Sequence, residues 1–243
     1  MLMRSFLRSF LAAVLLVAAM GSATAQRGIK VENLPNFDLH RFHFGFHLSY
    51  NTSDFQMVLD KRSPFRDSLL VLSHAKQPGF DLTMLASLNV NPFLSFRFSP
   101  TLSFQERVLT YSFRQEDNST KYFQKSVEST YLQFPLLLKY RSARINNFAV
   151  YLLGGGKFCI DMASQKDVNN SLDDEVVVKL DKYDYAAEVG GGMDMFLTYF
   201  KFGVELKAAF GIPNLLVDDG TRFSTPIQSL RSKVWVLTFT FEG

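Results

Sequence analysis

The chain has 243 residues, enough for one sizeable domain, and carries 26 Lys and Arg against 23 Asp and Glu. Because the charges nearly balance and no basic cluster occurs, we do not expect the protein to bind nucleic acid. The single cysteine, Cys159, excludes an intrachain disulfide, and we interpret it as a small apolar filler. Among the 25 phenylalanines, many fall at every second position of a segment, which makes them the most informative residue type.

The beginning of the chain has the features of a cleaved signal peptide. Arg4 and Arg8 provide a positive start, residues 10–20 are apolar, and small residues precede Gln26. The apolar run is too short to cross a bilayer as a helix. We therefore predict a signal peptide at 1–25, a periplasmic N-terminal segment at 26–40, and a barrel at 41–243.

Eight segments alternate apolar and polar side chains with a period of two, which predicts β-strands with one apolar face. The clearest runs from Phe200 to Ile212. The predicted strands lie at 41–50, 80–88, 94–113, up to 140, 148–162, 183–195, 200–212 and 235–241. In the third, the apolar positions change parity at Leu109, Tyr111 and Phe113. A bulge near Gln105–Val108 would explain the change, because one extra residue exchanges the two faces.

The links between these strands alternate in length. Short links are expected at 89–92, 141–147 and 196–199, and longer polar ones at 51–78, 114–121, 163–181 and 213–226. This alternation is typical of outer-membrane barrels, which have short periplasmic turns and longer external loops. We predict an all-β, eight-stranded antiparallel up-and-down barrel in the outer membrane. Its Phe and Leu faces contact lipid, and both termini are periplasmic.

A soluble eight-stranded barrel is the alternative, since alternation alone does not say which face points inward. The number of phenylalanines on one face and the asymmetry of the links both favour the membrane barrel.

Several segments resemble the PorT-like outer-membrane proteins. They are the strand Tyr131–Arg141, the glycines 154–156, the segment Glu188–Asp194, and Phe202–Gly211 followed by Asn214–Leu216. The resemblance covers nearly the whole mature chain and implies an accessory part in type IX (Por) secretion. That system exports proteins with a sorting domain, such as gingipain-type proteases, so other secretion-system proteins are the implied partners. A general OmpX-like barrel that presents loops or anchors a partner is the alternative.

The motifs that could carry chemistry do not have the required spacing. Gly154 to Lys157 lacks the phosphate-loop pattern, and His43 and His47 stand too far apart on one strand for a shared metal ion. Ser49, His47 and Asp54 lie close in sequence, but nothing fixes a catalytic geometry. We expect no enzymatic activity, cofactor, metal or small-molecule substrate.

The predicted inward faces carry charges that should pair, because eight strands leave room only for side chains. This lumen network comprises Arg97, Lys139, Asp184, Glu188, Asp194, Lys201, Glu205 and Lys207, with Lys157 beside it. A two-residue turn at Leu197 and Thr198 would set Asp194 opposite Lys201 and Glu188 opposite Lys207. The interior should therefore be a filled plug and not a conduit.

Glycines and prolines mark two further positions. The strand glycines Gly154, Gly155 and Gly156 should face Gly190, Gly191 and Gly192 across a strand pair, in a flexible or sharply curved patch. Pro100 and Pro135 should interrupt the ladder between the third and fourth strands, because proline has no N–H to donate.

Overall fold

The computed structural model describes residues 32–60, 63–64, 68–115, 117–164 and 178–243. All of its described secondary structure belongs to one compact unit, Asn33–Gly243. The predicted signal peptide lies outside the described residues. No helix in the described part of the chain has the length and apolar character needed to cross a bilayer.

Period-two alternation produces strands along nearly the whole unit, as the sequence predicts. A 3-10 helix, η1, spans Phe37–Leu39 ahead of them. The strands are β1 (Phe42–Leu59), β2 (Leu69–Asn91), β3 (Leu94–Phe98), β4 (Thr101–Arg114), β5 (Thr120–Arg141), β6 (Phe148–Asp161), β7 (Tyr183–Phe196), β8 (Lys201–Gly211) and β9 (Ile227–Glu242).

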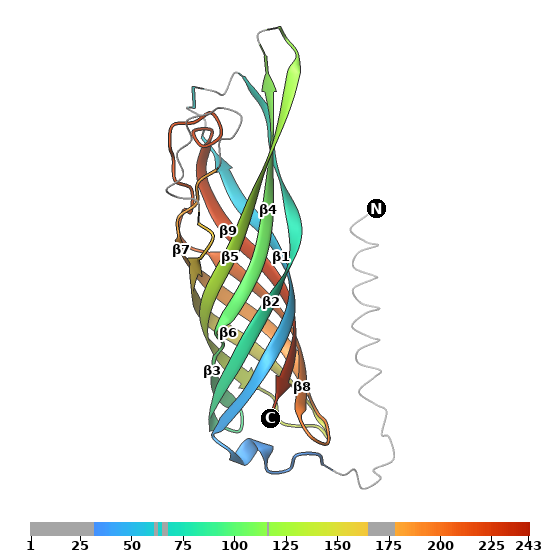
Figure 1. Cartoon of the computed structure of the whole chain (residues 1–243). Coiled ribbons are helices and arrows are strands. Elements are labelled where there is room, and N and C mark those ends of the chain that lie inside the picture. Colours follow the sequence, from blue (N-terminus) through green and yellow to red (C-terminus); the bar gives the residue numbers. More distant parts are fainter. Residues whose placement is uncertain (1–31, 61–62, 65–67, 116, 165–177) are drawn as a thin grey trace, which may run out of the picture. The chain divides into compact units, whose positions relative to one another are not determined.

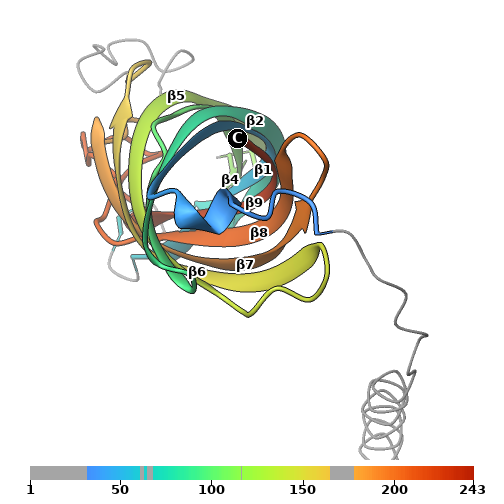
Figure 2. The same cartoon turned by 90° about the horizontal axis from the view of Figure 1, so that it is seen from below.

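The strands form a closed antiparallel barrel (Figure 1 and Figure 2). Apart from β3 and β4, strands that follow one another in the sequence pair with each other, and β1 closes the ring by pairing with both β2 and β9. β3 and β4 both pair with β2 and β5, so they make one wall position interrupted at Ser99–Pro100. The predicted eight-stranded barrel is confirmed, with its third strand divided in two.

The interruption at Pro100 is the one expected from the prolines. Pro100 and Pro135 both lie in this gap, where the Ser99 N–H still donates to the Pro135 carbonyl at 3.2 Å. The register with β5 is the same on both sides of the gap: Phe98 stands opposite Leu136, and three residues later Thr101 stands opposite Gln133. The ladder therefore loses assigned pairs without gaining a bulge.

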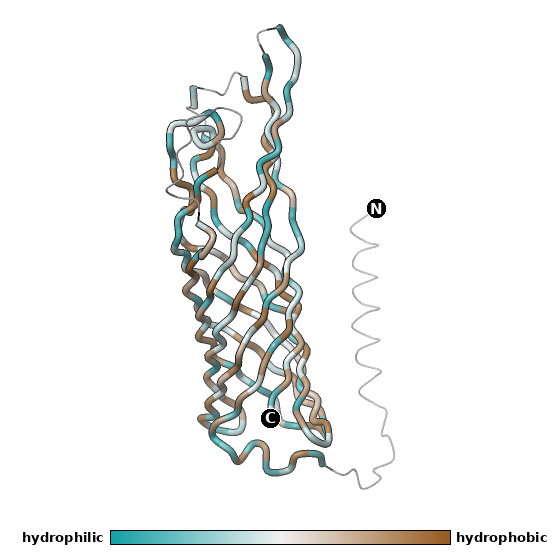
Figure 3. Tube along the Cα trace, in the orientation of Figure 1, coloured by the Kyte–Doolittle hydropathy of each residue, from teal (hydrophilic) through white to brown (hydrophobic). Residues whose placement is uncertain are grey.

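The apolar faces point outward, as predicted. Phe44 is 67 % exposed and Leu152 is 67 % exposed, whereas His43 and Tyr151 beside them point inward and are buried. Figure 3 shows brown and teal alternating along the strands. Aromatic side chains are exposed along this outer surface, among them Phe42, Tyr140, Phe148 and Tyr199 toward one end, and Tyr50, Phe80, Tyr183, Tyr185 and Trp235 farther along.

The two ends of the barrel differ. At the turn end lie the short links β2–β3, β5–β6 and β7–β8, together with η1 and the C-terminus (Figure 1). At the loop end lie the links β1–β2, β4–β5, β6–β7 and β8–β9. The expected loop at 51–78 is wrong, because β1 continues to Leu59 and β2 already begins at Leu69. The β4–β5 link is also short, spanning only 115–119, because its strands extend instead.

The predicted bulge in the third strand is wrong as well. From Thr101 to Arg114, β4 keeps one register with β5. Leu109, Tyr111 and Phe113 keep the inward parity of the polar residues before them and are almost fully buried. The inner face therefore changes from polar to apolar along β4, which produces the same sequence pattern as an exchange of faces.

Candidate functional site in the barrel interior

The turn-end half of the interior is filled by charged side chains. All eight residues of the predicted lumen network are buried: Arg97, Lys139, Asp184, Glu188, Asp194, Lys201, Glu205 and Lys207. Period-two alternation places them there, because each shares the parity of the small and polar residues on its strand. A buried charge is costly unless it is paired, so their contacts decide whether the interior is stable.

Arg97 lies at the centre of one group of ion pairs. Its guanidinium contacts Glu205 and also Glu242, the latter at 3.3 Å. Tyr151 donates its hydroxyl to the same Glu205 carboxylate at 2.8 Å. Lys201 Nζ approaches Glu242 to 2.8 Å. Strands β3, β6, β8 and β9 are thus joined across the lumen and not only through the ladders around it.

A second group surrounds Asp194 and Glu188 on β7. Lys139 Nζ lies 2.6 Å from Asp194 and 3.6 Å from the centre of the Tyr151 ring. Lys157 and Lys207 approach Glu188 from either side, at 3.6 Å and 3.3 Å. These bases and acids come from four neighbouring strands, β5 to β8.

The predicted register between β7 and β8 is wrong by two residues. Asp194 stands opposite Gly203, and Lys207 opposite Gly190. The link 197–200 is longer than the two-residue turn assumed, and the Leu197 N–H bonds to the Phe200 carbonyl. Long charged side chains reach diagonally and across the lumen. Lys207 therefore still meets Glu188, while Lys201 and Asp194 take other partners.

Asp184 differs from the other acids of the network, because no ion pair within 4 Å is found for it in the described part of the chain. It borders a cavity of about 10 Å³ together with Arg107 and Lys157. A second cavity of about 20 Å³ lies at the turn end beside Lys139. Volumes of this size hold only one or two water molecules. The two cavities in the polar half therefore offer room for water and not for a ligand.

The glycine triplets do not face one another. Gly155 stands opposite Glu188, and Gly191 opposite Leu152, three positions away along the ladder. At the usual strand rise this offset is about 10 Å, so the predicted common patch is wrong. Instead, Gly192 leaves room for a lumen side chain, because a Cβ there would lie 2.8 Å from the Tyr151 ring. The barrel wall has no side chain at Gly192, and the Tyr151 ring occupies that space in the interior.

At the turn end, the segment Asn33–His40 covers the mouth of the barrel (Figure 2). Phe37 is buried, stacks on His43 at 3.9 Å between ring centres, and contacts Phe196 edge-on. Asp38 binds Arg141 at 2.8 Å. We call this segment the strap, and it closes the turn end from below.

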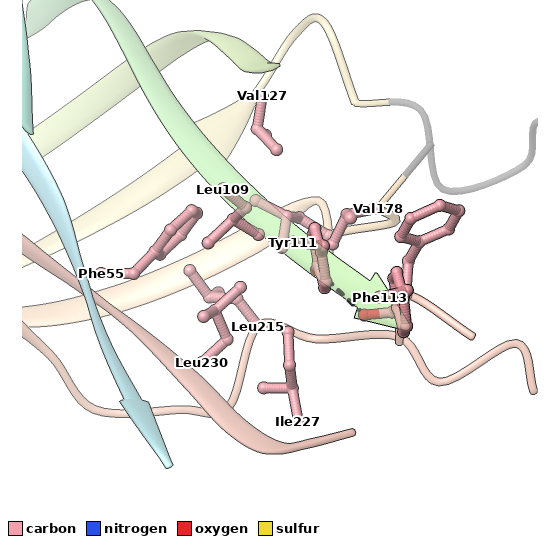
Figure 4. Close-up of a cluster of buried hydrophobic side chains, with 11 residues drawn as sticks. Phe55, Leu109, Tyr111, Phe113, Val127, Val178, Leu215, Ile227 and Leu230 are labelled. Atoms are coloured by element: carbon pink, nitrogen blue, oxygen red, sulfur yellow. Dashed lines mark hydrogen bonds between the residues drawn. The ribbon is translucent and has the colours of Figure 1, made fainter. Parts of the chain in front are cut away.

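The loop-end half of the interior is an apolar core (Figure 4). Its buried members come from β1, β4, β5, β9 and the links before β7 and after β8: Phe55, Leu109, Tyr111, Phe113, Val127, Val178, Leu180, Leu215, Phe223, Ile227 and Leu230. The Tyr111 hydroxyl donates to the Phe223 carbonyl at 3.0 Å, which satisfies the polar atom of the cluster. The β8–β9 link thus folds inward over the charged half.

The residues considered for catalysis or metal binding separate in the structure. Ser49 Oγ donates to Thr238, and Asp54 contacts His74, which lies on β2 and not in the expected loop. His47 is buried, and neither of its ring nitrogens has a hydrogen-bond partner in the part of the chain that the structure describes. No group of three or more His, Cys, Asp or Glu suited to a metal ion occurs among the described residues. Gly154 to Lys157 runs inside β6 and forms no loop.

Two further charged residues of the interior could have been predicted from the same alternation but were not. Glu242 has the same parity on β9 as the buried Thr238 and Thr240. Arg107 continues the inward series of β4, but the assumed bulge placed it elsewhere. The sequence of the strap has no hydrophobic periodicity from which its position across the barrel mouth could be predicted.

A closed barrel with an apolar outer belt and a filled interior defines an integral outer-membrane β-barrel protein. The chain belongs to the family described as outer membrane protein beta-barrel domain, which matches residues 24–217. No curated protein sequence matches the chain.

Two solved structures are similar in fold over most of the chain. The outer membrane protein OprG from Pseudomonas aeruginosa has 11 % identity and a TM-score of 0.44, covering 84 % of this chain and 97 % of its own. Neisserial surface protein A has 10 % identity and a TM-score of 0.38, covering 82 % of this chain and 96 % of its own.

Proposed function

We propose that this barrel is an accessory outer-membrane component of type IX (Por) protein secretion, which acts by assembly or docking. The proposal combines the sequence resemblance to PorT-like proteins with the filled interior. We place the turn end and both termini in the periplasm and the loop end toward the medium, as is usual for outer-membrane barrels. The barrel performs no reaction, and its partners are lipid and other secretion-system proteins.

The filled interior is the observation that carries the accessory role. Arg97, Lys139 and Lys201 occupy the middle of the lumen in ion pairs, and the apolar core and the strap lie beyond them on either side. A folded protein needs an opening far wider than an eight-stranded barrel provides. Any contribution to export therefore comes from the surfaces of the barrel.

Deleting the gene and following proteins with a type IX sorting domain tests this proposal. We expect these proteins to accumulate in the periplasm and to return to the surface when the gene is restored. Outer-membrane barrels unrelated to secretion serve as the control and should assemble normally in the deletion strain. Normal surface delivery in that strain would contradict the secretion role and favour the OmpX-like alternative.

A further inference from the structure

The barrel wall opens between β1 and β2 near the loop end. Their pairing ends at Ser53 with Gln77, although β1 continues along β9 and β2 continues along β4. Pro78 lies opposite Thr52 in the pair just before this last one, and the register of β2 against β4 shifts between Lys76 and Phe80. A register shift of this kind bends a strand locally. We call the resulting gap the β1–β2 seam.

The seam leaves backbone groups of β2 without a partner strand in the described part of the chain. The Arg114 N–H donates to the Ser68 carbonyl at 2.7 Å, which fixes the side of β4 that faces β2. Antiparallel bonds alternate, so Val71 and Ser73 direct their N–H and C=O groups at β4. Leu72, between them, directs its N–H and C=O into the seam.

The bottom of the seam is closed by side chains. Asp54 accepts the Phe55 N–H at 2.8 Å and contacts His74 Nδ1 at 2.5 Å. The Phe55 N–H, which is the next backbone donor of β1, is therefore already bonded. The Asp54–His74 contact links the two strands just beyond their last pair. Only the part of the seam beyond Asp54 and His74 is open.

An apolar cavity of about 630 Å³ lies in this open part. Its walls are the outer ends of β1 and β2, with Pro226 from the link before β9. The lining residues are Met57, Val58, Leu59, Asp60, Ser63, Leu69, Leu70, Leu72 and Pro226. The cavity thus combines apolar side chains with an unpaired strand edge.

The β2 edge also lacks the features that usually prevent strand pairing. From Leu69 to Ala75 it contains no proline and no Asp, Glu, Lys or Arg. The outer part of β5, which pairs with β6 only from Tyr131 onward, carries Lys121, Lys125 and Glu128. Charged residues on exposed strands discourage unwanted pairing. In one molecule, the β5 edge is protected and the β2 edge is open.

We propose that the β1–β2 seam binds an extended peptide segment of a partner protein, which adds to β2 as a further strand. Its backbone pairs with the free groups of β2, and its alternate apolar side chains enter the cavity. A lipid tail fits the apolar walls but cannot satisfy a strand edge, whereas a peptide satisfies both. Strand addition stands independently of the type IX role, since it follows from the seam alone.

A synthetic peptide with matched backbone variants tests this proposal. The probe is a fluorescent eight-residue peptide with valine at every second position, serine and threonine between, and lysine at both ends. Its control has the same side chains but carries N-methyl groups on alternate amides, which removes backbone donors. We expect saturable binding of the first peptide to the mature protein in lipid nanodiscs, and at least tenfold weaker binding of the second.

Two neighbouring substitutions locate the site. Leu70 lines the cavity and is 41 % exposed, whereas Val71 is 56 % exposed and does not line it. Leu70→Glu should weaken binding at least tenfold, and Val71→Glu should change it less than twofold. Both side chains are exposed, so both variants should keep the folded form, as checked by the gel shift on heating.

Three results would overturn strand addition. The first is absence of saturable binding, and the second is equal binding of the N-methylated peptide, which would indicate a side-chain pocket only. The third is a wild-type dimer that Leu70→Glu dissolves, which would assign the edge to a second copy of this chain. Equal effects of the two substitutions would place the peptide elsewhere on the barrel and contradict the proposed site.

Discussion

Arg97 shows how single residues determine the state of the interior. It contacts two carboxylates, Glu205 and Glu242, and only 1 % of its side chain is exposed. Removing one partner of a buried ion pair leaves a charge that neither water nor a base can stabilise. The stability of the polar half therefore depends on complete pairing more than on the number of charges.

Arg97→Leu should destabilise the barrel by about 3–5 kcal/mol, because it leaves Glu205 without its main base and removes one of two from Glu242. The measurement is urea unfolding in lipid vesicles, followed by the gel shift between folded and unfolded forms. Lys182→Leu, at an exposed position, is the control and should change stability by less than about 0.5 kcal/mol. Equal effects of both substitutions would show that the network contributes nothing.

Two glycines of the triplets give a matched pair of substitutions. A Cβ at Gly192 would lie 2.4 Å from the Val204 carbonyl and 2.8 Å from the Tyr151 ring, whereas at Gly154 it would meet nothing within 4 Å. Gly192→Ala should cost about 1–3 kcal/mol through this overlap. Gly154→Ala should be neutral or slightly stabilising, since alanine lowers the entropy of the unfolded chain. The same unfolding assay compares them, and a harmless Gly192→Ala would contradict the need for space at Tyr151.

At this scale the sequence predicts which side chains are inside but not how they pair. Parity alone identified Asp194 and Lys201 as lumen residues, as their burial shows. Their partners, Lys139 and Glu242, come from strands distant in sequence. A link two residues longer than assumed was enough to change the register between β7 and β8, and alternation carries no information about link geometry.

Among the elements, the strap has the most direct effect on the interior, because it covers the turn-end mouth. Phe37 is 7 % exposed within it, while Leu39, two residues later, is 77 % exposed. The segment is held by the stacked Phe37 ring, by the Asp38–Arg141 ion pair and by hydrogen bonds of Asn33 to the β5–β6 link and to Phe196. It can therefore be loosened without altering any strand.

Phe37→Ala should weaken the strap and admit water to the charged half, at a cost of about 3 kcal/mol from the lost ring. Hydrogen exchange of backbone amides near the turn end provides the measurement, and exchange there should become faster. Leu39→Ala is the control and should leave exchange unchanged. If both substitutions left it unchanged, the strap would not limit access.

The strands themselves could be predicted, but their full length could not. In the outer parts of β1 and β2, beyond the apolar belt, both faces meet water or protein and the alternation disappears. The same limit explains the error at β4, where apolar residues fill a core and do not contact lipid. An apolar side chain at the expected parity says that it avoids water, but not which apolar environment surrounds it.

On the scale of the whole molecule, two kinds of side-chain packing fill the interior of one barrel. Ion pairs fill the turn-end half, and an apolar core fills the loop-end half. The purified protein should therefore show no large, stable conductance in planar bilayers at neutral pH. A wide porin reconstituted in the same way is the positive control. Stable openings of porin size from this chain alone would contradict the filled interior and, with it, the accessory role.

The position of the apolar core gives membrane insertion a direction. Its eleven buried side chains lie on the outer parts of strands and on links at one end. In the proposed orientation, with the loop end facing the medium, this core forms only after those segments have crossed the bilayer. Burying that many apolar side chains releases free energy on the order of 10–30 kcal/mol, released only on the far side. Sliding back would require dissolving this core before any strand could move. In that orientation the core acts as a thermodynamic latch that opposes withdrawal of the barrel from the membrane.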